Sequence, residues 1–425
     1  MQPAFRPELT RSRPPHSVPS HCGRGSAARS AARLPGSREQ VTQPRRQRDP
    51  LVFISAAEPS ADRHAAALIR AARRRRPDIR FIGMTGPAMR DAGCESVFDM
   101  TAEAAMLLGV LHIAGRAVRF WRTADAHLRR YAFDAVVVVD SPTLHLPLAG
   151  NAHALGIPVL YYIAPQMWAW GEYRIHKLRD RIDRAAVILP FEETYFRSRG
   201  VPATYVGHPL AEAWEEWTLR EEKVAEIRAA GSPLIAVLPG SRKHVVASNL
   251  PAELAVIRRV LAARPGSACA VSVAGPQLQP IVERTAARMG VPVRTVRGHH
   301  HELIRAADLV LVTSGTAALE VAFHEKPMIV LYQASRLFYH LVARWFLHTP
   351  HLSLPNILAG RRIVPEFMPY YRDLDAVART ALEILDTPDR RERIRADLCD
   401  VTAALRKGRA SENTADLLLD MIDRR

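Results

Sequence analysis

Short apolar runs alternate with amphipathic stretches along most of this chain. The first run covers 51–55. A stretch with helical periodicity follows and ends in the basic run 73–76, and a second strand is expected after it, in DIRFIGM. Short continuous apolar runs bounded by turn residues are typical of strands buried on both faces of a parallel sheet. The pattern therefore predicts a βαβ unit at the start of the ordered chain.

The alternation of strand and helix occurs in two successive series. The first continues through FDAVVVVDSP, IPVLYYIAP and RAAVILP, and the second contains PLIAVLPGSRKH, ACAVSVAG, VPVRTVRG, ADLVLVTSGTAALE and KPMIVLYQ. The two series join near residues 205–220. We therefore predict the α/β class, with two Rossmann-like domains, 50–208 and 209–425, facing each other across a cleft. A last helix that packs back on the first domain is an open alternative.

The composition indicates which partners suit the chain. Its 425 residues are 48% hydrophobic and carry a formal net charge of +16, which favours nucleic acid, phosphorylated ligands or an acidic membrane. No run of about 18 uncharged apolar residues occurs, so we expect a soluble protein without a transmembrane helix. The four cysteines form no CxxC pair and are typical of a reducing compartment.

Residues 1–49 differ from the rest of the chain. They are rich in Arg, Pro, Ser and Ala and contain few acidic residues. This segment has too little apolar content to fold, so we expect a disordered basic tail. A transit peptide and a wrongly assigned start codon are the two alternatives.

One short turn is suited to holding an anion. In LVLVTSGTAALE, an apolar run leads through Ser314, Gly315 and Thr316 into a predicted helix. Backbone N–H groups and the positive end of a helix dipole at such a turn favour a phosphate. Glu320, one helical turn further on, is suited to hydrogen bonds with a ribose diol. A helix capped by its Ser and Thr side chains is an equally weighted interpretation.

Two further turns lie in the same half of the chain, and the first of them strengthens the interpretation as an anion site. LPGSR places Gly240, Ser241 and Arg242 after an apolar run, and an arginine is suited to paired contacts with phosphate oxygens. SLPN supplies Ser353 and Asn356 as candidate contacts to a base or a phosphate, although an ordinary turn is the favoured interpretation there.

Several motifs occur together in one order along the chain: AEPSAD, VVVDSP, YYIAPQMWAW, ILPFEETYF, YVGHPL, LPGSR, TSGTAALE and SLPN. In this combination the chain resembles the lipid A disaccharide synthase family from about Leu51 to the C-terminus. The resemblance implies a GT-B glycosyltransferase that joins UDP-2,3-diacylglucosamine to 2,3-diacylglucosamine 1-phosphate. The product is a β-1,6-linked disaccharide 1-phosphate, released together with UDP. The resemblance also implies inversion at the anomeric centre with no metal and no cofactor.

The resemblance assigns roles to the candidate residues. Arg242 and the helix start at Ser314 would stabilise the departing diphosphate. The UDP-sugar site would contain Gly240, Ser241, Arg242, Ser314, Gly315, Thr316, Ala317, Glu320, Ser353 and Asn356.

Asp140, which ends the run AVVVVD, is the candidate base for the acceptor 6-hydroxyl. From the residues alone, an Asp that caps the next turn is the favoured interpretation, and the family match reverses this preference. Glu58 and Asp62 are alternative catalytic carboxylates. Ser60 or Asp62 as a simple helix cap is the structural alternative.

This chain departs from the family pattern at several positions. Ala57 and Ala61 replace two glycines, where we expect a tight turn to be strained. Thr143 and His145 replace an aspartate and an asparagine, and Val245 replaces an acidic residue. We therefore keep open an altered acceptor, reduced activity or a silent nucleotide-sugar binding protein.

Three other features need separate interpretations. His208 lies at the inferred hinge, where interdomain or substrate contact and simple capping are both open. We interpret His299, His300 and His301 as polar surface, because three consecutive residues seldom face one metal. Trp168 and Trp170 are equally suited to core packing and to a sugar platform.

Two stretches, 106–123 and 335–348, combine apolar, basic and aromatic residues. They are typical of interfacial segments, with a buried helix as the alternative. We expect a cytoplasmic protein bound peripherally to the inner membrane, with no nucleic-acid partner and with a homodimer left open. A sugar-nucleotide epimerase of the same architecture is the alternative enzyme.

Overall fold

The computed structural model describes residues 48–99, 110–169, 171–333, 350–369 and 373–424. Most of the expected tail, the second interfacial stretch (335–348) and Trp170 lie outside these residues, as does the start of the first stretch. Residues 49–425 form one compact unit, which contains every helix and strand described below.

The first half of this unit contains a seven-stranded parallel sheet in the order β3-β2-β1-β4-β5-β6-β7. Its central strands are buried along their whole length, as their continuous apolar runs predict. The strands are β1 (Leu51–Ala56), β2 (Arg80–Thr85), β3 (Glu95–Asp99), β4 (Ala135–Val139), β5 (Val159–Tyr162), β6 (Arg184–Val187) and β7 (Ala203–Tyr205).

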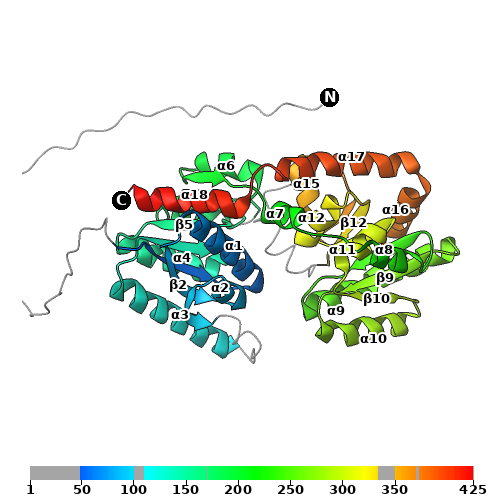
Figure 1. Cartoon of the computed structure of the whole chain (residues 1–425). Helices are drawn as coiled ribbons and strands as arrows, with labels where there is room; N and C mark the ends of the chain where they lie inside the picture. Colours follow the sequence, from blue (N-terminus) through cyan, green and yellow to red (C-terminus); the bar gives the residue numbers. More distant parts are fainter. Residues whose placement is uncertain (1–47, 100–109, 170, 334–349, 370–372, 425) are drawn as a thin grey trace, which may run out of the picture. The chain divides into compact units, whose positions relative to one another are not determined.

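Helices pack on both faces of the first sheet (Figure 1). Phe53 of β1 belongs to one apolar cluster, and its neighbours Val52 and Ile54 belong to the cluster on the opposite face. Many of the helices begin with proline, whose missing N–H costs nothing in the first turn. The helices are α1 (Pro59–Arg75), α2 (Pro87–Asp91), α3 (Val110–Arg130), α4 (Pro142–Ala154), the 3-10 turn η3 (Glu172–Arg174), α5 (Ile175–Arg179), α6 (Pro190–Arg197) and α7 (Pro209–Glu215).

The second half contains a six-stranded parallel sheet in the order β10-β9-β8-β11-β12-β13. Its strands are β8 (Leu234–Leu238), β9 (Ala268–Val273), β10 (Arg294–Arg297), β11 (Leu309–Thr313), β12 (Met328–Leu331) and β13 (Glu366–Phe367). Its helices are α8 (Glu221–Arg228), α9 (Lys243–Ala263), the 3-10 turn η4 (Pro276–Leu278), α10 (Gln279–Met289), α11 (His300–Ala306), α12 (Thr316–Phe323), α15 (Leu354–Ala359), α16 (Leu374–Asp386) and α17 (Pro388–Leu405).

The C-terminal helix α18 (Ala410–Asp423) packs against α1, which belongs to the first sheet (Figure 1). The basic end of α1 pairs with acidic residues of α18, including Arg75 with Asp416 at 2.6 Å and Arg76 with Asp423 at 2.6 Å. Most of these ion pairs are exposed, so each contributes at most about 1 kcal/mol, and the apolar contacts of α18 contribute most of the packing energy.

The topology places the candidate loops at two sheet edges. In each sheet the strand order reverses between two neighbouring strands, β1 and β4 in the first and β8 and β11 in the second. Ala56 pairs with Val139, and Leu238 pairs with Val312, so the loops that follow these strands begin side by side. Ligands bind at such switch points in open α/β sheets. The predicted fold class, α/β with two Rossmann-like halves, is confirmed.

Candidate active site and nucleotide site

Asp140 lies at the carboxyl end of β4 in a left-handed backbone conformation. Its φ is 55°, that of Ser141 is 48°, and α4 begins at Pro142. Two consecutive non-glycine residues in this region are uncommon and cost about 1–3 kcal/mol each. Burial raises the pKa of the half-buried Asp140 carboxyl, while a hydrogen bond from the Ser141 backbone N–H lowers it. The carboxylate therefore combines partial burial with a strained backbone, as functional sites often do.

The backbone carbonyl of Asp140 accepts hydrogen bonds from two buried side chains. The Tyr161 hydroxyl donates to it at 2.8 Å, and Nδ1 of His145 donates at 2.7 Å. The other ring nitrogen of His145, Nε2, lies 2.9 Å from the Ser55 Oγ at the end of β1. His145, a departure from the family pattern, is therefore a buried link between the two central strands of the first sheet.

The other two candidate carboxylates differ in surroundings. Glu58 is the exposed N-cap residue of α1, and its side chain makes no capping hydrogen bond. Asp62 is 4% exposed and accepts hydrogen bonds from the backbone N–H groups of Gly86 at 2.9 Å, Ala88 at 2.9 Å and Met89 at 3.1 Å. Asp62 therefore holds the start of α2 and does not cap its own helix.

The replacements of glycine by alanine fit this backbone. Neither Ala57 nor Ala61 has a positive φ, and Ala61 is buried within α1. The expectation of strain at these two positions is therefore wrong, because neither position requires a left-handed conformation. Val245 packs against Gly240: a Cβ added at Gly240 would lie 2.9 Å from Cγ1 of Val245.

The first nucleotide-site turn joins β8 to α9. Gly240 has a φ of 106°, a conformation that favours glycine. Arg242 is the exposed N-cap residue of α9, and the first turn of this helix contains no acidic residue. The turn therefore combines an exposed arginine with a helix N-terminus, and both are suited to an anion.

The second turn joins β11 to α12, next to the first one in the sheet. Gly315 has a φ of 145° and is exposed together with Thr316, while Ser314 and Ala317 are half-buried. The first turn of α12 also lacks an acidic residue. The helices that follow two paired strands thus begin at the same sheet edge, and the dipole of each favours a negative charge at its N-terminus.

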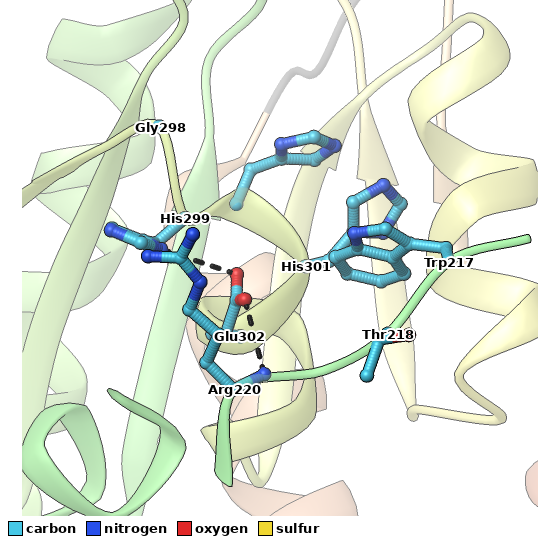
Figure 2. A pocket seen from close by; sticks show the side chains of 8 residues that line it. Trp217, Thr218, Arg220, Gly298, His299, His301 and Glu302 are labelled. Carbon is cyan, nitrogen blue, oxygen red and sulfur yellow. Dashed lines mark hydrogen bonds and ion pairs between the residues drawn. The ribbon is translucent and has the colours of Figure 1, made fainter. Parts of the chain in front are cut away.

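Glu320 connects the second turn with a neighbouring pocket. Its Oε2 lies 3.6 Å from Nε2 of His300. Figure 2 shows the pocket, of about 250 Å³, lined by Trp217, Thr218, Arg220, Gly298, His299, His300, His301 and Glu302. The ring of His301 packs on that of Trp217, and its Nδ1 lies 3.2 Å from Nε2 of His324. The interpretation of His301 as polar surface is wrong, because its ring packs in this aromatic cluster.

Ser353 and Asn356 form a buried group with Glu366 of β13. Both are 0% exposed, and each donates from its side chain to Glu366, at 2.7 Å and 2.9 Å. The Asn356 Oδ1 also accepts from the backbone N–H groups of Ile363 and Val364. The side chains are thus occupied within the protein and fix α15, which packs against α12.

His208 is the buried N-cap of α7. Its Nδ1 accepts a hydrogen bond from the Leu210 backbone N–H at 3.1 Å. Burial, with His64 nearby, lowers the pKa of His208 to about 4, so the ring is neutral and able to cap. Trp168 is also buried, and its Nε1 donates to Glu192 at 2.9 Å, which is the core-packing alternative.

Comparison with known proteins identifies the family. The family model described as lipid-A-disaccharide synthetase matches residues 52–420. The chain belongs to this family. Among its relatives are the lipid-A-disaccharide synthase of Syntrophus aciditrophicus (strain SB), 35% identical over 386 residues that cover 88% of this chain and 98% of that protein, and that of Geobacter sulfurreducens, 32% identical over 373 residues (87% and 97%). The family resemblance stated from the motifs is confirmed.

Solved structures of other proteins have the same fold as this chain. A glycotransferase of kitacinnamycin has a TM-score of 0.58 at 15% identity and covers 88% of this chain and 100% of its own. A UDP-GlcNAc 2-epimerase from Neisseria meningitidis, solved with UDP-GlcNAc, has a TM-score of 0.58 at 12% identity and covers 88% and 99%. At this identity the likeness shows the fold alone, so it does not favour the epimerase alternative.

The sequence did not reveal two buried residues that contact the candidate site in this chain. Tyr161 reads as a strand residue, and nothing in YYIAP indicates a bond to Asp140. Glu253 is a 1% exposed carboxylate on α9 whose Oε1 accepts from the Thr313 hydroxyl, directly before the second turn. A charged residue inside the apolar run NLPAELAVI was the signal that could have revealed Glu253.

Proposed function

We propose that this chain is a lipid-A-disaccharide synthase, a hexosyltransferase of lipid A biosynthesis. It joins UDP-2,3-diacylglucosamine to 2,3-diacylglucosamine 1-phosphate and releases UDP. The observation that carries the proposal is the family match over residues 52–420, with relatives at 32–35% identity along nearly their whole length. The epimerase alternative is supported by likeness to solved structures at 12–13% identity, which shows the fold alone, and the silent alternative is distinguished by an assay of turnover.

The donor would bind at the carboxyl edge of the second sheet. The diphosphate would lie between the two helix N-termini, with the Gly240–Arg242 turn on one side and the Ser314–Ala317 turn on the other. Arg242 would make paired contacts with phosphate oxygens, and Glu320 would accept hydrogen bonds from the ribose. Ser353 and Asn356 would act through α15, because their side chains are used by Glu366.

The chemistry we propose is a direct inverting displacement. The acceptor 6-oxygen attacks the anomeric carbon of the donor while the bond from that carbon to the phosphate oxygen breaks, and UDP leaves with the electron pair. Asp140 accepts the 6-hydroxyl proton, for which a raised pKa and partial exposure suit it. The charge that develops on UDP is stabilised by Arg242 and the helix dipoles. Glu58 would orient the acceptor, and Asp62 would position α2.

We further propose peripheral binding to the cytoplasmic face of the inner membrane, because both substrates carry acyl chains. Among the described residues no helix is apolar and long enough to span a bilayer. On α3, Val118 is 44% exposed beside the exposed Arg119 and Arg122, whereas Phe120 is buried. Sedimentation with anionic and with neutral vesicles tests the membrane proposal, and light scattering tests whether the protein is a homodimer.

The decisive experiment measures UDP release from the donor with and without the acceptor, followed by mass analysis of the lipid. The synthase predicts acceptor-dependent UDP release and a disaccharide 1-phosphate. An epimerase would instead convert the sugar nucleotide without needing an acceptor. Donor binding without any product would support the silent alternative. Loss of turnover in Asp140→Asn, with unchanged donor binding, would support Asp140 as the base.

A further inference from the structure

The backbone at Asp140 needs an explanation beyond its side chain. Asp140 and Ser141 both have positive φ values, 55° and 48°, between a buried strand and a helix that begins with proline. Non-glycine residues persist in this region only where the surroundings hold them. Something must therefore hold this turn in place.

Three buried side chains meet at this turn. Tyr161, His145 and Ser55 are each 0% exposed. Tyr161 comes from β5 and Ser55 from β1, the two strands that flank β4 in the sheet, and His145 comes from α4. The Asp140 carbonyl thus receives one donor from the helix that follows it directly, α4, and one from the neighbouring strand β5.

The chemistry of these contacts fixes the His145 tautomer. A carbonyl oxygen only accepts, so Nδ1 of His145 carries the proton that it donates to Asp140. Nε2 is then the acceptor, and the Ser55 hydroxyl donates to it. Burial lowers the pKa of His145 to about 4, which keeps this neutral form through the ordinary assay range. Burial raises the pKa of Tyr161 well above its usual range, the nearby Asp140 carboxylate raises it further, and Arg174 opposes both effects, so the hydroxyl keeps its proton.

We propose that His145 and Tyr161, with Ser55 behind His145, are positioning residues that hold the Asp140 turn left-handed and so aim its carboxylate at the acceptor. This inference rests on the proposed function, in which Asp140 is the base. In this turn the Ser141 backbone N–H donates a hydrogen bond to the Asp140 carboxylate. If the turn left the left-handed conformation, the carboxylate would lose this hydrogen bond and its orientation towards the acceptor. His145, which replaces the family's asparagine, still supplies a side-chain N–H donor.

The test uses a matched pair of neighbouring tyrosines. Tyr161→Phe removes only the hydroxyl that donates to Asp140. Tyr162→Phe is the control, because Tyr162 is equally buried in β5 but belongs to the opposite face of the sheet and bonds Thr414 of α18. His145→Leu removes the second donor to the Asp140 carbonyl, and His145→Asn restores an N–H donor. Ser55→Ala removes the hydroxyl that donates to Nε2 of His145 and so no longer fixes the proton on Nδ1.

We expect Tyr161→Phe and His145→Leu to lower kcat about ten- to a hundredfold, with the donor KM within about twofold of the parent. The acid limb of the kcat/KM profile should move to higher pH, because the Asp140 carboxyl loses the Ser141 hydrogen bond that lowers its pKa. His145→Asn should recover most of kcat. Tyr162→Phe should change neither kcat nor the profile.

Two results would overturn the inference. One is a folded Tyr161→Phe protein with unchanged kcat and pH profile. The other is an equal loss in Tyr162→Phe, which would indicate a general effect on the core. If Tyr161→Phe does not fold, His145→Leu and Ser55→Ala decide the question by the same readouts, and unchanged kcat and pH profile in the folded His145→Leu protein would overturn the inference. Full turnover in Asp140→Asn would refute the proposed base by itself, independently of these variants.

Discussion

The buried carboxyl of Glu253 predicts that stability falls as the pH rises. Glu253 lies on α9 and is 1% exposed, and its Oε1 accepts a hydrogen bond from the Thr313 hydroxyl at 3.1 Å. Its Oε2 has no hydrogen-bond partner among the residues that the structure describes. Burial raises the pKa from 4.5 to about 8, although the bond from Thr313 opposes this. The group is therefore neutral in the folded protein at physiological pH.

The sign of the effect follows from proton binding. Between pH 4.5 and about 8 the unfolded chain has lost the Glu253 proton and the folded chain keeps it. The folded state binds more protons in this window, so stability is greatest below it and falls as the pH rises towards 8. One fully shifted group contributes on the order of 1 kcal/mol per pH unit, and the total over the window is at most a few kcal/mol.

Glu253→Gln isolates this contribution. Glutamine keeps an acceptor for Thr313 and cannot ionise, so the difference in unfolding free energy between the variant and the parent should move in favour of the variant from pH 5 to pH 8. Urea unfolding at several pH values measures it, and Glu222→Gln, at an exposed site on α8, is the control. Other groups, including Glu192 with a pKa raised to about 7, cancel in the difference. Parallel stability curves for Glu253→Gln and the parent would refute the reasoning.

Three more predictions concern the two sheet edges. Gly315→Ala should raise the donor Kd about tenfold in calorimetry. A φ of 145° strains any residue with a side chain by about 1–2 kcal/mol even in open space, so the turn would move away from the conformation that binds the donor. An unchanged Kd would refute this. Arg242→Lys should lower kcat/KM for the donor by about tenfold through loss of paired phosphate contacts, whereas the same assay on Lys243→Ala, one residue further on, should show a smaller loss. Asp62→Ala should lower the unfolding free energy in urea by about 2–4 kcal/mol, because three backbone N–H groups of α2 lose their acceptor, and a loss below about 1 kcal/mol would contradict this.

The sequence alone determined the fold class and the family. The apolar runs at 51–55 and 309–313 are continuous because those strands are covered on both faces, and this local signal does not depend on distant partners. Gly240 and Gly315 mark the ends of strands in the sequence, because a positive φ at a turn favours glycine and this requirement is also local. Residue type and spacing were therefore sufficient to place these two turns at the ends of strands, and their role as nucleotide turns stays a prediction.

Only the tertiary structure decided what the polar side chains contact. Asp62 holds backbone groups 24–27 residues away, and His145 reaches Ser55 across 90 residues. Ser353 and Asn356 are candidate ligand contacts in the sequence, but in the folded chain both side chains donate to Glu366. A hydrogen-bond partner is chosen by the sheet order and the packing of helices on it, and strands adjacent in the sheet can be far apart in sequence. Local sequence predicts where a polar group lies, whereas its partner depends on the folded chain.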